Sequence, residues 1–127
     1  MEGKRILVID DDMCFLEVIQ YFLGMEKYRV TGITQAEDII PLVESTKPDL
    51  VLLDYLLPSS NGANMCRKLH ECPDLKGLPL VLTSAYPHQQ LPLDNVSYSI
   101  FIPKPFDLWY LLACMKKLLG RRFDTAT

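Results

Sequence analysis

Long hydrophobic runs are missing from this chain of 127 residues. No apolar stretch reaches the roughly 20 residues that a membrane-spanning helix needs, and no signal-peptide pattern opens the sequence. We therefore expect a cytoplasmic protein without membrane contact. Basic clusters are also scarce: the net charge is −3, and the basic pairs at 116–117 and 121–122 fit the end of a helix. The charge pattern thus predicts no direct binding of nucleic acid.

Metal-binding and redox spacings of cysteine are absent as well. The four cysteines match neither a zinc site nor a C-x-x-C motif, so we expect each to pack as a small apolar side chain. The sequence also contains no internal repeat, linker or low-complexity stretch. Apolar residues make up 49% and charged residues 23%, as is typical of a globular protein. The length predicts one domain, over residues 1–127.

What the sequence does contain is an alternation of short apolar runs with segments of helical periodicity. This pattern is typical of βαβ units and a parallel sheet. The predicted strands are residues 6–9, 29–33, 50–53, 80–83 and 99–102.

Helices are expected between these strands at about 14–25 and 63–70, and after the last strand at about 108–119, with Gly120 as the stop signal of that helix. Residues 34–37 have the form of a capping box and should start another helix, in which Pro41 would cause a kink or a late start. The stretch 87–95 contains two prolines and no apolar stripe. We expect a loop there, with at most one helical turn.

Aspartates close two of the apolar runs. Asp54 follows the run 50–53, and Asp10, Asp11 and Asp12 follow the run 6–9. Because the carboxyl ends of parallel strands meet at one edge of a sheet, these acids should lie together. Asp12 is expected to cap the next helix. The remaining cluster repels itself, so it predicts a divalent cation with oxygen ligands, such as Mg²⁺, beside a reactive Asp54.

Ser84 and Lys104 follow the fourth and fifth apolar runs and should reach the same edge. A nucleophilic carboxylate, a metal, a cation and a hydroxyl are what phosphoryl transfer to a carboxylate requires. Four short motifs occur in order along the chain: Asp10-Asp11-Asp12, Asp54 followed by Pro58 and Gly62, Ser84-Ala85, and Lys104-Pro105-Phe106. In these motifs the chain resembles the receiver domains of two-component response regulators, over nearly its whole length.

The resemblance implies a flavodoxin-like (βα)₅ fold of the α/β class, a doubly wound five-stranded parallel sheet of order 2-1-3-4-5. It also implies that Asp54 accepts a phosphoryl group from a histidine kinase or a histidine phosphotransfer protein, in a reaction that needs Mg²⁺. The chain would be a regulatory domain rather than an enzyme, with no output domain in these residues.

The resemblance further implies a role for individual residues. Asp11, Asp54 and the backbone carbonyl of Leu56 would bind Mg²⁺ directly, and Asp10 largely through water. Ser84 and Lys104 would bind the phosphoryl oxygens, and Phe101 would be the aromatic side chain that changes rotamer. The bond between Lys104 and Pro105 would be cis.

The chain departs from this family between the fourth and fifth strands, where receivers usually have a helix. Pro87 and Pro92 compromise that helix, so we expect a short or irregular one. A homodimer through the usual surface is therefore in doubt. The phosphorylated chain would instead signal by binding a downstream protein or an output domain on another chain.

Two other functions fit parts of the sequence. A pseudo-receiver would keep the fold as an interaction module without phosphorylation, but the complete set of acids, hydroxyl and lysine opposes it. A Mg²⁺-dependent phosphohydrolase would need a second acid two residues after Asp54, where Leu56 stands. The receiver remains the preferred hypothesis.

Leu56 and Tyr86 occupy the two positions that tune water access to the acyl phosphate in this family. Since both side chains are bulky, we predict slow loss of the phosphoryl group, and faster loss in a Leu56→Asn variant. The measurement is the lifetime of the phosphorylated protein by intact mass. Equally fast hydrolysis in the two proteins would contradict the prediction.

Overall fold

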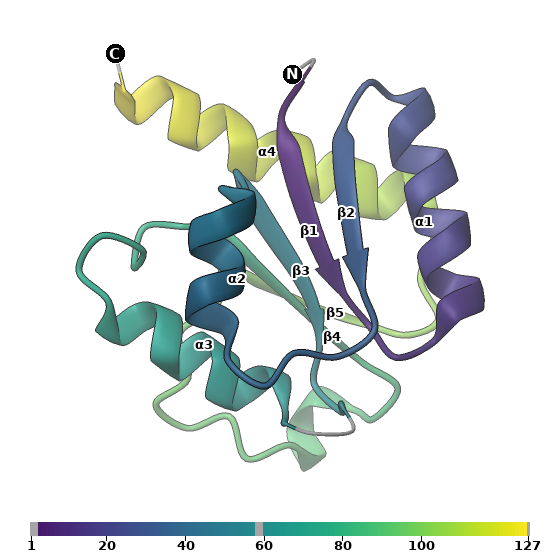
Figure 1. Cartoon of the computed structure of the whole chain (residues 1–127). Coiled ribbons are helices and arrows are strands. Elements are labelled where there is room, and N and C mark those ends of the chain that lie inside the picture. The colour runs from purple at the N-terminus through teal and green to yellow at the C-terminus, as the bar shows by residue number, and fades with distance from the viewer. Residues whose placement is uncertain (1–2, 58–59, 127) are drawn as a thin grey trace.

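The computed structural model describes residues 3–57 and 60–126, so the predicted motif residue Pro58 lies outside the described part. Strands and helices alternate along the chain (Figure 1). In order, the elements are β1 (Arg5–Ile9), α1 (Met13–Met25), β2 (Arg29–Ile33), α2 (Ile39–Thr46), β3 (Leu50–Asp54), α3 (Gly62–Glu71), β4 (Leu80–Ser84), the 3₁₀ turn η1 (His88–Gln90), β5 (Ile100–Pro103) and α4 (Leu108–Ala126).

The five strands form one parallel sheet of order β2-β1-β3-β4-β5. Helices α1 and α4 cover one face of the sheet, and α2 and α3 cover the other (Figure 1). The predicted α/β class, the doubly wound parallel sheet and its strand order are therefore confirmed. Within the described residues, no helix is both long and apolar enough to cross a membrane.

Alternate side chains of the central strands build two separate cores. On β1, Ile6 and Val8 pack toward α1 and α4, whereas Leu7 and Ile9 pack toward α2 and α3. Every residue of β3 is buried. Burial on both faces explains why these strands are continuous apolar runs in the sequence.

The second helix starts later than the capping box at 34–37 predicts. Asp38 is the N-cap, and its carboxylate accepts a hydrogen bond of 3.1 Å from the backbone N–H of Ile40. Pro41 is thereby the third residue of the helix, where an N–H has no intrahelical acceptor. The predicted start at residue 34 is wrong. The helix starts late, at Ile39, which is one of the two effects expected from Pro41, and the proline causes no loss of a helical hydrogen bond.

Helix α4 continues past Gly120 to Ala126, so the predicted stop at residue 119 is also wrong. A glycine ends a helix only where the backbone turns left-handed; inside a helix it costs about 1 kcal/mol relative to alanine. The expectation that all four cysteines are packed fails at Cys14, which is exposed. Cys66 is buried as expected.

The connection between β4 and β5 contains a single 3₁₀ turn in place of a helix, as predicted. Leu93, Val96 and Tyr98 pack on the core below it. Its two ends are joined because His88 Nε2 and the Tyr98 hydroxyl lie 2.7 Å apart.

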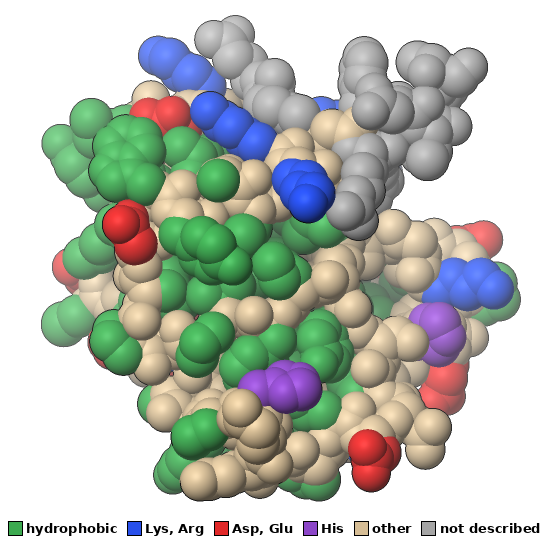
Figure 2. Space-filling view, turned by 180° about the vertical axis from the view of Figure 1, so that it is seen from behind, with side chains coloured by type: hydrophobic (Ala, Val, Ile, Leu, Met, Phe, Trp, Pro, Cys, Tyr) green, Lys and Arg blue, Asp and Glu red, His purple; other side chains and the backbone are tan. Residues whose placement is uncertain are grey.

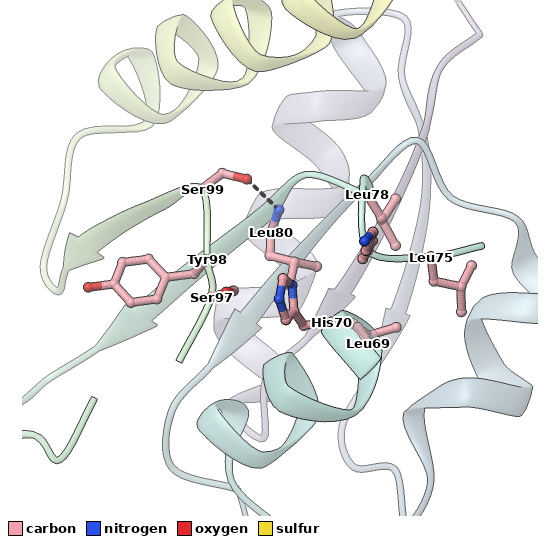
Figure 3. A pocket seen from close by; sticks show the side chains of 9 residues that line it. Leu69, His70, Leu75, Leu78, Leu80, Ser97, Tyr98 and Ser99 are labelled. Carbon is pink, nitrogen blue, oxygen red and sulfur yellow. Dashed lines mark hydrogen bonds between the residues drawn. The ribbon is translucent and has the colours of Figure 1, made fainter. Parts of the chain in front are cut away.

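A pocket of about 180 Å³ lies between α3 and the segment that leads into β5 (Figure 3). Leu80, the first residue of β4, lines it, and its N–H donates a hydrogen bond of 3.0 Å to Ser99 Oγ. The pocket thus lies at the amino end of the strands, away from the carboxyl edge where the sequence places the site.

Gly62, the first residue of α3, lies directly against the end of β3. A Cβ atom there would be 2.6 Å from the Asp54 carbonyl oxygen and would also meet Leu53 and Leu82. The Gly62 N–H donates a hydrogen bond of 2.8 Å to the Tyr55 carbonyl. Only a residue without a side chain allows α3 to begin this close to Asp54.

We predict that Gly62→Ala destabilises the fold by about 1–3 kcal/mol, because the added methyl group overlaps backbone that cannot move aside. Gly24→Ala is the matched control: nothing lies within 4 Å of its Cβ, so alanine in α1 should stabilise by up to about 1 kcal/mol. Urea unfolding measures both. Equal effects of the two substitutions would refute the close packing of α3 on β3.

Candidate functional site

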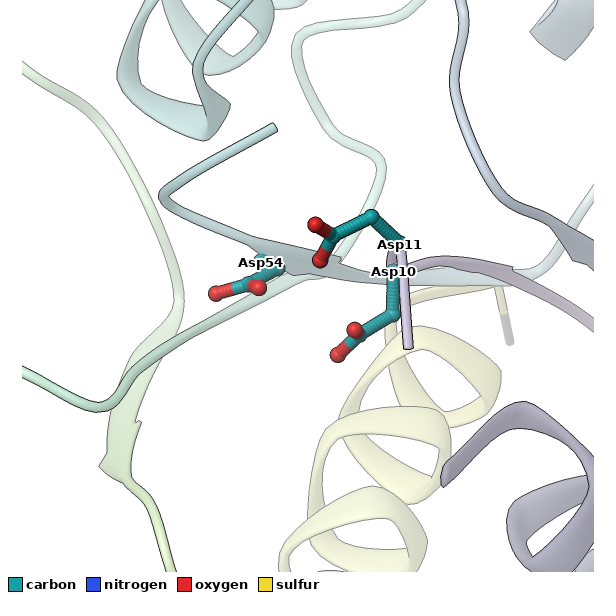
Figure 4. A group of neighbouring side chains, drawn as sticks. All are labelled: Asp10, Asp11 and Asp54. Carbon is teal, nitrogen blue, oxygen red and sulfur yellow. The ribbon is translucent and has the colours of Figure 1, made fainter. Parts of the chain in front are cut away.

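Three carboxylates meet at the carboxyl edge of the sheet. Asp10 and Asp11 follow β1, and Asp54 is the last residue of β3, the neighbouring strand. One oxygen from each lies within 4.8 Å of the others (Figure 4). Carboxylate oxygens at this spacing can hold a divalent cation, so the donor set fits the expected Mg²⁺.

The loop after β1 is ordered by its own acids. Asp10 Oδ1 accepts a hydrogen bond of 3.0 Å from the N–H of Asp12. Asp12 in turn is the N-cap of α1, as predicted, and accepts from the N–H of Phe15 at 3.1 Å. Asp10 is buried while Asp11 is exposed, so the two neighbours differ in access to solvent.

Lys104, which follows β5, reaches the same cluster. Its Nζ lies 2.6 Å from Asp10 Oδ2 and 3.6 Å from Asp54 Oδ2. Its backbone N–H donates to the Ser84 carbonyl at 2.8 Å, which fixes the end of β5 to the end of β4. The Lys104–Pro105 bond is cis, as the resemblance implies. One ammonium therefore partly neutralises two buried acids.

The pKa of Asp54 is raised to about 6, mainly because the carboxyl is buried. Lys104 and a hydrogen bond from the Leu56 backbone lower this pKa, whereas Asp10 and Asp11 raise it. Near neutral pH the Asp54 carboxyl is ionised, but burial makes its charged form less stable than it would be in water. A cation that approaches the carboxylate stabilises this charged form.

Ser84 ends β4 one residue beyond Thr83, which pairs with Asp54 in the sheet. The Ser84 side chain is buried, and its Oγ accepts a hydrogen bond of 2.9 Å from the N–H of Tyr86. A cavity of about 510 Å³ opens beside it, lined by residues 85–89, Phe101, Pro103 and Lys104. The hydroxyl is thus tied to the connection that replaces the fourth helix.

The other predicted residues lie on β5 and in the connections after β3 and β4. Phe101 is half-buried, and its ring contacts those of His88 and Tyr98 at 4.9 and 6.4 Å between centroids. Leu56 and Tyr86 lie in the connections after β3 and β4, and their side chains are 54% and 51% exposed. Phe101 therefore packs against the β4–β5 connection and not against the acids.

Sequence reasoning missed Phe15. Its ring centroid lies 4.5 Å from Lys104 Nζ, and Phe106 packs edge-on against the same ring at 5.7 Å. An apolar residue in the first turn of a helix carries no local signal of this contact, because its partners come from the far end of the chain.

Comparison with known proteins identifies the class. The family model of the response regulator receiver domain matches residues 6–116. The chain belongs to this family.

The curated relatives are longer proteins. The uncharacterized transcriptional regulatory protein YbdJ of Bacillus subtilis is 31% identical over an alignment of 128 positions, which covers 100% of this chain and 56% of that protein. The response regulator MprA of Mycolicibacterium vanbaalenii is 33% identical over 92% of this chain and 51% of its own length. The chain spans about half the length of these relatives.

Solved structures agree over the whole fold. A CheY-like receiver domain protein from Methanospirillum hungatei superposes with a TM-score of 0.87 at 26% identity, over 98% of this chain and 99% of that one. The response regulator TrrA from Thermotoga maritima, solved in complex with Mg²⁺ and BeF, has a TM-score of 0.80 at 28% identity, over 91% and 98%.

The raised pKa of Asp54 predicts how stability depends on pH without metal. The folded chain binds this proton more tightly than the unfolded chain, so stability is lost as pH rises from about 4 through about 6. Asp54→Asn removes the charge and should stabilise the protein at pH 7 by roughly 1–3 kcal/mol. Urea unfolding in EDTA at several pH values measures the gap between the free energies of unfolding of the variant and of the wild-type protein. This gap should shrink as the pH falls below about 6. A gap independent of pH would contradict the prediction.

Proposed function

We propose that this chain is a phosphorylation-dependent switch in which Asp54 is the phosphoacceptor. The observation that carries the proposal is the convergence of Asp54, two further acids and Lys104 at one edge of the sheet. Receiver domains serve phosphorylation-dependent signalling, and the chain belongs to that family. The donor would be a phosphohistidine on a histidine kinase or a phosphotransfer protein.

In the transfer step, a carboxylate oxygen of Asp54 attacks the phosphorus atom. The donor imidazole is protonated at its other ring nitrogen, so when the P–N bond breaks and its electron pair stays on nitrogen, neutral histidine is released. The new acyl phosphate carries up to two negative charges where the Asp54 carboxylate carried one, so the charge of the site becomes more negative by up to one unit beside Asp10 and Asp11. Neighbouring positive charge must therefore increase or move closer.

Asp10, Asp11, Asp54 and the Leu56 carbonyl are the groups that would hold Mg²⁺. When bound, this ion would neutralise charge on the phosphoryl oxygens. Mg²⁺ and BeF bound to TrrA support this choice of ion. Lys104 would pair with a second phosphoryl oxygen by leaving its 2.6 Å contact with Asp10. Ser84 would donate its hydroxyl proton to a third.

The switch would act through the connection after β4. When the Ser84 hydroxyl turns toward the phosphoryl group, it gives up the hydrogen bond that it accepts from Tyr86. The segment 86–98 would then be free to shift, and Phe101 would change rotamer as its contacts with His88 and Tyr98 change. Ser84 thus links the acidic edge to the surface around η1.

The surface that a partner would bind is apolar. Figure 2 shows the molecule from behind relative to Figure 1, and hydrophobic side chains occupy much of this face. Tyr86, Trp109 and Tyr110 are each more than half exposed. We infer that a downstream protein, an output domain on another chain or a second copy binds there, and that residues 1–127 act as one receiver domain.

Incubation with acetyl phosphate and Mg²⁺ should add one phosphoryl group, detected by intact mass. Asp54→Asn and omission of Mg²⁺ should each abolish the gain. Asp49→Asn is the matched control: this acid precedes β3 at its opposite end, where it accepts a hydrogen bond from the Arg5 N–H, so the variant should still be phosphorylated. No gain by the folded wild-type protein would instead favour the pseudo-receiver.

A further inference from the structure

Three neighbours surround the ammonium group of Lys104. Asp10 Oδ2 lies at 2.6 Å, Asp54 Oδ2 at 3.6 Å and the ring centroid of Phe15 at 4.5 Å. An ammonium has three N–H donors, and an aromatic face attracts a cation within about 6 Å of its centroid. The side chain of Lys104 is only 20% exposed, so the attraction to the ring is little weakened by water.

The backbone of Phe15 is held by one contact and its ring by another. Its backbone N–H donates to the carboxylate of Asp12, the N-cap of α1, which places Phe15 in the first helical turn beside the acidic loop. Phe106 packs against the ring at 5.7 Å, with the two planes 87° apart. The ring face presented to Lys104 is therefore fixed before any ligand arrives.

We propose that Phe15 is a positioning residue: its ring face holds the ammonium of Lys104 between Asp10 and Asp54. Without the ring, a lysine on four rotatable bonds would be held by the carboxylates alone and would turn toward solvent more often. With it, the ammonium stays beside the oxygens that an incoming phosphoryl group approaches. This consequence for phosphorylation rests on the proposed function, whereas the position of the ammonium does not.

The position can be tested without phosphorylation. Protons above an aromatic ring resonate upfield, so the Lys104 ε-methylene signal, assigned by loss in Lys104→Arg, should lie upfield of ordinary lysine signals. Phe15→Leu fills a similar volume but has no ring, and should return the signal to its usual position. Phe15→Tyr keeps the ring and should keep the shift.

The matched control is Phe22→Leu. Phe22 also lies on α1 and packs edge-on against an aromatic ring, that of Trp109 at 5.1 Å, two helical turns from the acidic loop. Phosphorylation by acetyl phosphate and Mg²⁺ should slow by roughly threefold to tenfold in Phe15→Leu. It should recover in Phe15→Tyr and stay unchanged in Phe22→Leu.

A Lys104 signal that is the same in wild type and Phe15→Leu would overturn the proposal. So would an equal loss of rate in Phe15→Leu and Phe22→Leu, which would indicate a general packing defect. If the wild-type chain takes up no phosphoryl group, the proposed function fails, and the Lys104 signal still decides whether Phe15 positions the lysine.

Discussion

Repulsion among three carboxylates is the constraint on which the carboxyl edge of this domain depends. Asp10, Asp11 and Asp54 are brought within 4.8 Å because two neighbouring parallel strands end side by side. Among the described residues, one ammonium, that of Lys104, pairs with these acids. The pKa of Asp54 stays raised because burial outweighs the effect of this ammonium. The site is therefore built to gain free energy from added positive charge, which is what a cation-dependent switch requires.

The chain departs from the usual receiver in the connection between β4 and β5. In place of a fourth helix, a connection with one 3₁₀ turn covers the core through Leu93, Val96 and Tyr98. Few of its backbone groups are held by regular hydrogen bonds, and the contact between His88 and Tyr98 joins its ends. Such a segment opens at a lower free energy than a packed helix, which suits it to respond to a change at Ser84.

Local patterns in the sequence predicted most of the fold and the acidic part of the site. Strands buried on both faces leave continuous apolar runs, and the residue that ends each run marks the carboxyl edge, so Asp10, Asp54 and Lys104 could be placed together. The start of α2 was predicted only in part: a late start was one expected effect of Pro41, but residue 34 and Asp38 are both good caps and no local pattern singled out Asp38. The contact of Phe15 with Lys104 was out of reach for a different reason: it depends on tertiary packing between the first helix and the last strand.

Two edge-to-face aromatic pairs join α1 to the C-terminal part of the chain. Phe15 meets Phe106 just before α4, and Phe22 meets Trp109 within it. Contacts two turns apart along one helix resist both sliding and rotation, so α1 is firmly joined to the beginning of α4. We therefore expect a change at the acidic edge to move the β4–β5 connection more than α1 and α4. The domain would then have a rigid part, α1 with α4, and a more flexible part, the β4–β5 connection. A partner that binds both parts would detect a change in their relative position.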